Sequence, residues 1–154
     1  FLYAKNNKIK GSDMFKLDKR LEQDTIFIKN LNLSKLLLMN NSNFPWLILV
    51  PMRENLIELI DLSKTDQQQL LSEISSLSRF LKKTDPKGKI NIGTLGNIVN
   101  QLHIHIVIRN KNDLAWPNSI WGFDNHSPYS KEQSLKLLEE ISNFLNEEDN
   151  IPNE

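Results

Sequence analysis

The sequence predicts a single α+β domain in which an antiparallel sheet of about five strands is covered by two main helices. Three observations predict it: short apolar runs bounded by turn residues, two long amphipathic segments, and the lack of internal repeats or a second composition regime. We assign residues 14–154 to this domain. Residues 1–13 have no clean hydrophobic period, so we expect a flexible or non-native leader before Met14.

Composition excludes several classes of function. The chain has 19 basic and 19 acidic side chains, and this balance argues against a nucleic-acid-binding protein. It has no cysteine, which excludes disulfides, thiolate metal sites and a cysteine nucleophile. No apolar segment reaches the roughly 18 to 20 residues of a membrane span, and no signal peptide pattern is present. We therefore expect a cytoplasmic protein that acts on small molecules.

The first third of the domain predicts a short helix and three strands. Leu17 and Leu21 lie four residues apart, which is typical of a brief helix. Short apolar runs at 26–28 and 36–38 predict two strands. The run 46–50 predicts a fully buried strand, because prolines flank it and a missing N–H is tolerated at strand ends.

Two long helices are expected in the rest of the chain. Thr65 and Gln68 have the spacing of a capping box, and the helix after them should end at 85–88, which contains proline and glycine. Ser130 and Gln133 repeat the capping pattern before the last helix. The expected apolar faces comprise Leu70, Ile74, Leu77 and Leu81 in the first helix, and Leu137, Leu138, Ile141, Phe144 and Leu145 in the second.

Two further strands are expected between these helices. Residues 89–92 alternate as a short strand, 93–96 form a loop with glycines at both ends, and 101–108 form an apolar run that contains two histidines. A loop of this kind between two strands predicts an antiparallel pair.

The second of these strands carries a polar row. Side chains on a strand alternate between its faces, so Gln101, His103 and His105 should point one way. The apolar residues between them should point to the core. The chemistry of the protein is therefore expected on the face with the two histidines.

This arrangement resembles the histidine triad (HIT) family of nucleotidyl hydrolases and transferases. That family has three histidines that alternate with apolar residues, and the middle one is the nucleophile. On this pattern Gln101 stands in the first place, His103 is the nucleophile and His105 is the third member. Glutamine in the first place, with Trp116-Pro117 and Trp121-Gly122 downstream, resembles one branch of the family. The likeness covers about residues 15–125 and implies a HIT-like fold and a homodimer.

The resemblance implies cleavage of a nucleotide phosphoanhydride or phosphoramidate, or nucleotidyl transfer, through a covalent nucleotidyl-histidine that releases a nucleoside monophosphate. The residue types suit this chemistry. A neutral imidazole such as that of His103 is a good nucleophile near pH 7. His105 and Gln101 can donate hydrogen bonds to phosphate oxygens.

The resemblance also implies residues that bind the substrate. Asn91 and Asn97 match amide positions near the phosphate, and Gly96 belongs to a loop whose backbone can approach it closely. Asn40 matches the acidic position that holds the ribose hydroxyls. Ile98 stands where many family members have a hydroxyl beside the leaving group, which leaves the source of the leaving-group proton open.

Other interpretations of the histidine pair remain open. Two histidines on one face of a strand can share a metal ion, but the strand has no cysteine or carboxylate to complete a site, so we expect no metal and no cofactor. The histidines can also be structural and half buried. At the level of function, the rivals are a nucleotide-sensing module without turnover and a partner-binding protein that uses the tryptophan segment.

The tryptophans and Arg109 also have more than one interpretation. Trp116 and Trp121 are expected to pack in a core, or else to close a nucleotide site across a subunit contact. Arg109 could attract phosphate, but it is expected to be a solvated charge at the strand end or a partner of Asp113. His126 is expected in a surface loop without a role.

Overall fold

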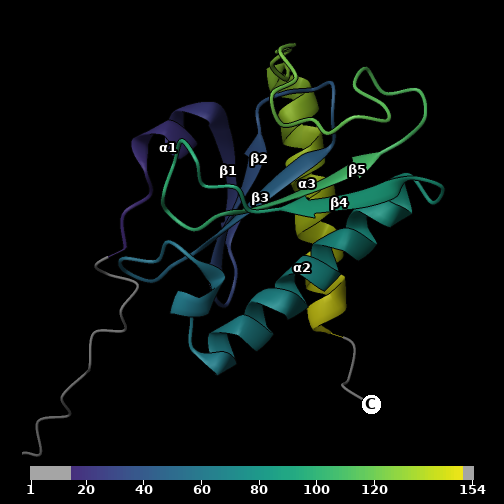
Figure 1. Cartoon of the computed structure of the whole chain (residues 1–154). Helices are drawn as coiled ribbons and strands as arrows, with labels where there is room; N and C mark the ends of the chain where they lie inside the picture. Colours follow the sequence, from purple (N-terminus) through teal and green to yellow (C-terminus); the bar gives the residue numbers. More distant parts are fainter. Residues whose placement is uncertain (1–14, 151–154) are drawn as a thin grey trace, which may run out of the picture.

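The fold is an α+β arrangement of one sheet and three α-helices, as the sequence predicts. The structure is a computed structural model that describes residues 15–150, so the expected leader and Met14 lie outside the described residues. The elements, in chain order, are α1 (Lys19–Asp24), β1 (Thr25–Asn30), β2 (Ser34–Met39), β3 (Trp46–Pro51), the 3₁₀ helix η2 (Leu59–Asp61), α2 (Lys64–Thr84), β4 (Lys89–Gly93), β5 (Ile104–Arg109) and α3 (Lys131–Asp149) (Figure 1).

The five strands form one antiparallel sheet in the order β1-β2-β3-β5-β4. One row of residues crosses all five strands, because the register pairs Phe27 with Leu37, Leu37 with Ile48, Ile48 with His105, and His105 with Gly93. His105 therefore lies on the strand next to one edge of the sheet. The strand next to it, β4, is an edge strand.

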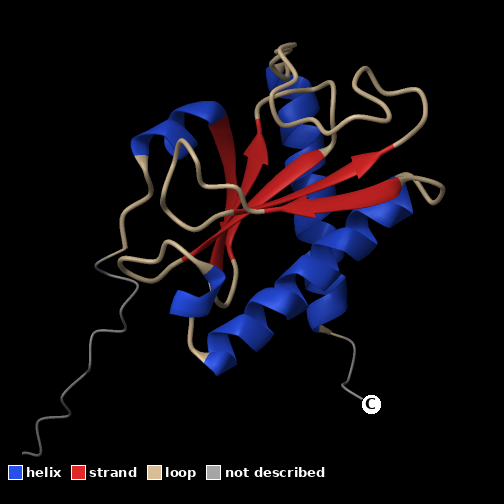
Figure 2. Cartoon of the chain, in the orientation of Figure 1, coloured by secondary structure: helices blue, strands red, loops and turns tan. Residues whose placement is uncertain are grey.

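The two faces of the sheet have different covers. On one face α2 and α3 bury the main core, which includes Leu36, Leu47, Leu49, Leu77, Ile104, Ile106 and Ile141. On the face with His105, α1 and the segment after β5 cover two smaller apolar clusters, around Ile48 and around Phe44. Figure 2 shows α1 well apart from the two long helices. None of the described helices is long and apolar enough to cross a membrane.

The helix ends are set by capping side chains. Ser130 and Gln133 form the predicted capping box at the start of α3. The predicted cap of the preceding helix is wrong by two residues, because Ser63 accepts the N–H of Asp66 and α2 begins at Lys64. Serine also suits this position, and three-residue spacing alone does not choose between the two caps.

The histidine strand is shorter than predicted. β5 begins at Ile104, so Gln101 and His103 precede it. The backbone N–H of Leu102 donates to the carbonyl of Leu56, which lies in a loop and not in a neighbouring strand. The residues just before Ile104 therefore lie outside the sheet, where Leu102 bonds to a loop, although the two histidines still lie together.

Candidate active site

The two histidine rings lie against each other on the sheet face opposite α2 and α3. Their ring centroids are 4.8 Å apart and the rings are inclined at 71°. His103 is only 6% exposed and His105 is 7% exposed. The backbone of β5 positions His105 between Ile48 and Gly93, and His103 lies just before the strand. The two histidines therefore lie on the same face of the sheet, as the alternation of side chains predicts.

A backbone carbonyl selects the tautomer of His103. Its Nδ1 lies 2.7 Å from the carbonyl oxygen of Gln101. Because a carbonyl oxygen can only accept a hydrogen bond, Nδ1 must carry the proton. In the neutral ring Nε2 then has the free lone pair. His103 is thus arranged to act as a nucleophile or base through Nε2.

A tryptophan selects the opposite tautomer for His105. The indole N–H of Trp46 donates to Nδ1 of His105 over 2.9 Å. An accepting Nδ1 carries no proton, so in the neutral ring the proton is on Nε2. The pKa of His105 is lowered from 6.5 to about 3, mainly by burial and to a smaller extent by the nearby His103. His105 is therefore a neutral hydrogen-bond donor at pH 7.

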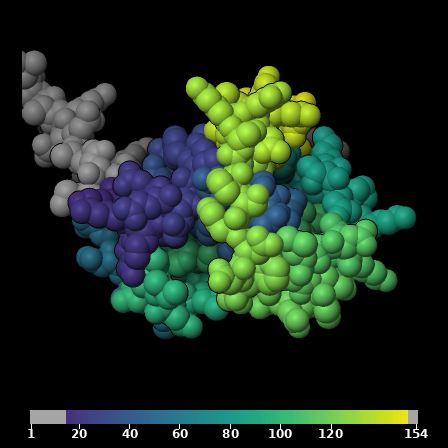
Figure 3. Space-filling view, turned by 90° about the horizontal axis from the view of Figure 1, so that it is seen from above, coloured from purple at the N-terminus to yellow at the C-terminus, as the bar shows by residue number. Residues whose placement is uncertain are grey.

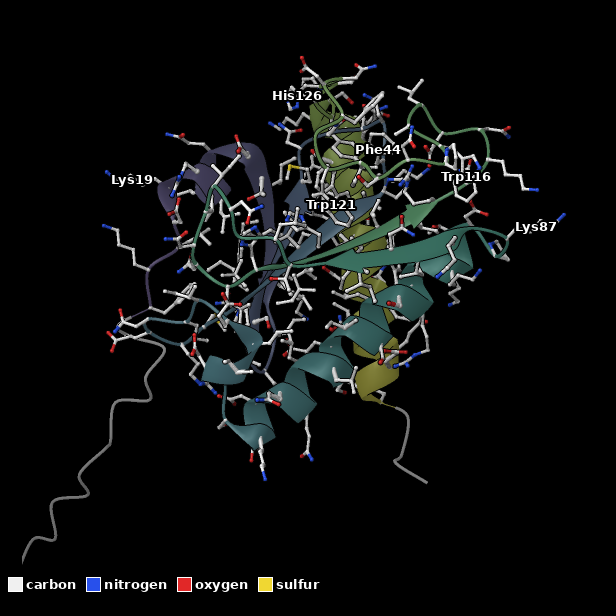
Figure 4. The ribbon with its side chains drawn as sticks, in the orientation of Figure 1. Lys19, Phe44, Lys87, Trp116, Trp121 and His126 are labelled. Carbon is white, nitrogen blue, oxygen red and sulfur yellow. The ribbon has the colours of Figure 1, made fainter. Side chains whose placement is uncertain are left out.

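Trp121 covers the other side of His105. The two ring centroids are 5.7 Å apart, and the indole lies over Gly93, where an added Cβ would be 2.9 Å from the ring. Glycine is required at this position because any side chain would push the indole away. Trp121 packs against the cluster around Phe44, as expected for a core residue, whereas Trp116 is 38% exposed and the expectation of core packing is wrong for it. Figure 4 shows Trp121 over the sheet, with Trp116 and the exposed His126 away from it.

A buried ion pair holds the segment that carries Trp121. Arg109 is only 1% exposed and donates two hydrogen bonds to the carboxylate of Asp113, at 2.7 and 2.9 Å. It also donates to the carbonyl of Asn118 and to Oδ1 of Asn91. The prediction of a solvated Arg109 is wrong, and the prediction of a partner of Asp113 is confirmed. Asn91 lies on the histidine face, with its amide oxygen occupied by Arg109.

Both ends of the Gln101 side-chain amide bond to the chain before α1. Its Oε1 accepts the backbone N–H of Asp18 and its Nε2 donates to the carbonyl of Lys16, both over 2.8 Å. The backbone carbonyl of Gln101 accepts the proton of His103 Nδ1. Gln101 therefore lies beside His103, and its amide connects residues 16–18 to the chain just before β5.

The same connection brings an ion pair to the histidines. Asp18 accepts hydrogen bonds from Nε and Nη2 of Arg20, each over 3.2 Å, and Arg20 Nη1 donates to the carbonyl of Ile98 over 2.6 Å. The Arg20 guanidinium lowers the pKa of the Asp18 carboxyl below its ordinary value, and His103 adds a smaller effect in the same direction. No local pattern in the sequence pointed to these two residues, because a charged residue in or just before a short helix is usually solvated.

The remaining predicted residues lie in loops around this face. Asn40 follows β2, and its Oδ1 accepts the backbone N–H of Tyr129. Gly96 has a φ of 67°, which favours glycine, and the exposed Asn97 follows it in the loop between β4 and β5. Seen from above in Figure 3, the purple residues that follow residue 14 lie on one side of the molecule, and the green segment after β5 lies on the other.

Comparison with known proteins identifies the family of the chain. The model of the HIT domain family matches residues 20–112, which is more than half of the chain. No curated protein matches the chain.

Three solved structures are similar over most of the chain, and each is described as a histidine triad protein. One from Sinorhizobium meliloti is 42% identical, with a TM-score of 0.83, over 86% of this chain and 98% of that one. One from Bradyrhizobium japonicum is 41% identical, with a TM-score of 0.81, over 84% and 96%. One from Marinobacter aquaeolei is 37% identical, with a TM-score of 0.83, over 86% and 97%.

Proposed function

Because the chain belongs to the histidine triad family, we propose that it cleaves a nucleotide phosphoanhydride or phosphoramidate, or transfers the nucleotidyl group, through His103. The hydrogen bond between His103 Nδ1 and the Gln101 carbonyl carries this proposal. It leaves the Nε2 lone pair free to attack the α-phosphorus, which forms a nucleotidyl-histidine. Water then attacks the nucleotidyl-histidine and releases a nucleoside monophosphate, or another acceptor takes up the nucleotidyl group.

His105 supports this reaction as a neutral donor. Its Nε2–H can donate to a phosphate oxygen whose charge grows as the pentacoordinate state forms. Because the His105 ring is neutral, it puts no positive charge beside the lone pair of His103. Gln101 contributes through its carbonyl, which keeps His103 in the reactive tautomer.

We place the substrate on the histidine face. The backbone around Gly96 and the amide of Asn97 are proposed to bind phosphate oxygens, and Asn40 is proposed to bind the ribose. Asn91 is proposed to donate to a phosphate oxygen through its Nδ2, because its amide oxygen already accepts from Arg109. We propose no cofactor or metal, and a formal net charge of zero favours a small nucleotide over a nucleic acid.

Covalent trapping tests the proposal. The protein is mixed with diadenosine triphosphate or adenosine 5′-phosphoramidate, quenched in seconds, digested and analysed by mass spectrometry. We expect an adenylyl group on the peptide that contains His103, no adduct in His103→Ala, and an unchanged adduct in the control His126→Ala, whose histidine is exposed. Turnover that persists in His103→Ala contradicts the mechanism. Binding without turnover in the unmodified protein supports a nucleotide sensor instead.

We also propose that two copies pair and that the protein acts in the cytoplasm. β4 is an edge strand, so one of its sides has no neighbouring strand in the sheet. Ile92 within β4 and Leu95 just after it are 52% and 49% exposed. Pairing along β4 would cover both residues. Light scattering of the purified protein tests this, since Ile92→Lys should shift the mass to that of a monomer while the equally exposed Leu135→Lys on α3 should not.

A further inference from the structure

Arg20 is held in place with part of its hydrogen-bonding capacity unused. A guanidinium has five N–H groups. Three of them bond to the Asp18 carboxylate and the Ile98 carbonyl. Among the described residues no partner accepts the other two, one on each Nη nitrogen, and the Arg20 side chain is 52% exposed. The guanidinium is therefore fixed in position and can still bind an anion in solution.

A series of three hydrogen bonds connects this guanidinium to the nucleophile. His103 donates to the carbonyl of Gln101, the amide oxygen of Gln101 accepts the N–H of Asp18, and the carboxylate of Asp18 accepts from Arg20. Arg20 also donates to the carbonyl of Ile98 in the loop between β4 and β5. One positive charge is thus held where the residues before α1 meet this loop, and the carboxylate that holds it is near enough to His103 for the two charges to interact.

The side chains in this network do not supply a proton at pH 7. His105 is a neutral ring whose Nδ1 is occupied by Trp46. Gln101 does not ionise, and Asp18 is held as a carboxylate by two hydrogen bonds from Arg20. Arginine stays protonated in proteins. An amine that leaves a phosphorus atom must take up a proton first, whereas a phosphate leaves as a stable anion.

We propose that Arg20 binds the departing phosphate, and that the preferred substrates are nucleoside polyphosphates and dinucleoside polyphosphates rather than phosphoramidates. This rests on the proposed function of His103. The Nε2 lone pair forms a bond to the α-phosphorus as the bond from that phosphorus to the bridging oxygen breaks. The bond electrons go to the leaving phosphate, which Arg20 neutralises without proton transfer. Water then breaks the P–N bond, and its surplus proton goes to the solvent.

Three substrates with the same adenylyl group and different leaving groups test the proposal. They are diadenosine triphosphate, adenosine 5′-(p-nitrophenyl phosphate) and adenosine 5′-phosphoramidate, which release a nucleoside diphosphate, a nitrophenolate and an amine. We expect kcat/KM for the amine substrate to be at least about a hundredfold below the other two. The Arg20→Ala variant should lower the ratio of diphosphate to nitrophenolate turnover about tenfold or more. Arg20→Lys should recover part of the ratio, because it restores the charge but not the fork.

Arg79→Ala is the matched control, because Arg79 also forms an exposed ion pair, with Glu148 at the other side of the molecule, and should leave the ratio unchanged. Amine release as fast as diphosphate release, with an adduct on His103, overturns the substrate preference and leaves the proposed function intact. An equal effect of Arg20→Ala on both substrates overturns the assignment of Arg20. No turnover and no adduct with all three substrates overturns the proposed function, and this inference with it.

Discussion

The indole N–H of Trp46 donates to Nδ1 of His105 over 2.9 Å, although the two residues are 59 positions apart in the chain. This bond decides which nitrogen of His105 carries a proton. His103 is held in the opposite tautomer by a backbone carbonyl. Two neighbouring imidazoles thus have complementary roles, one with a free lone pair and one with a free N–H at Nε2.

Replacing Trp46 with phenylalanine should remove this selection. We expect both tautomers of His105 to be populated and kcat to fall about tenfold. ¹⁵N shifts of the ring nitrogens report the tautomer. The control is Trp116→Phe, because Trp116 is 38% exposed and makes no ring contact with either histidine. Unchanged His105 shifts in Trp46→Phe would show that burial alone sets the tautomer.

The depressed pKa of His105 predicts that stability falls as the solution is acidified. The unfolded chain binds a proton at this histidine near pH 6.5, whereas the folded chain does so only near pH 3. Stability is therefore fully present above pH 6.5 and is lost by about 1.4 kcal/mol per pH unit as the pH falls towards 3. Between about pH 6 and 5 the carboxylates of Asp18, Asp113 and Glu148, whose pKa values are lowered, stay ionised in the folded state.

Urea unfolding at about pH 6 and pH 5 measures this loss. The loss should shrink in His105→Asn and persist in His126→Asn, since His126 is exposed. An equal pH dependence in the unmodified protein and in His105→Asn would mean that His105 accepts a proton while folded.

The buried ion pair of Arg109 and Asp113 should be costly to break. In Arg109→Met the Asp113 carboxylate loses its two short hydrogen bonds in a buried position. We expect a loss of about 3–5 kcal/mol in the free energy of unfolding. Arg79→Met breaks an exposed pair and should cost less than about 1 kcal/mol. Similar losses in both variants, measured by chemical denaturation, would contradict the structural role given to Arg109.

The contact between Gly93 and Trp121 can be tested by a double-mutant cycle. In Gly93→Ala the new Cβ would lie 2.9 Å from the indole, so the ring must move off His105. We expect a loss of about 1–3 kcal/mol in stability and a change in tryptophan fluorescence. In a Trp121→Ala background the same glycine substitution should cost much less. Additive losses would indicate that the two residues do not interact.

Gln101→Glu should loosen the N-terminal segment with little change in shape. A carboxylate cannot donate to the carbonyl of Lys16. In the variant a carboxylate oxygen would therefore replace the Nε2 donor that now lies 2.8 Å from this carbonyl, and the two oxygens would repel each other. We expect faster tryptic cleavage after Lys16 and Lys19. Gln67→Glu is the matched control, because it removes the hydrogen bond that the Gln67 side-chain amide donates to the carbonyl of Leu62, just before α2. Equal cleavage rates in the two variants would exclude a holding role for Gln101.

Local patterns in the sequence were enough to predict the α+β class, the five strands, the capping box of Ser130 and the common face of His103 and His105. These features follow from local rules, since hydrophobic period and cap spacing depend on residues a few positions apart. The same rules placed the cap of α2 at Thr65 instead of Ser63, because both residue types accept the same backbone bond.

Only the tertiary structure decided how the site is completed. Trp46 binds His105 from 59 positions away, and Gln101 binds Asp18 from 83 positions away. Arg109 is buried because Asp113, Asn91 and the carbonyl of Asn118 surround it together. Hydrogen bonds between distant segments depend on sheet register and loop packing, which local patterns do not specify. The sequence thus placed the histidines, and the folded chain determined which of their nitrogens can react.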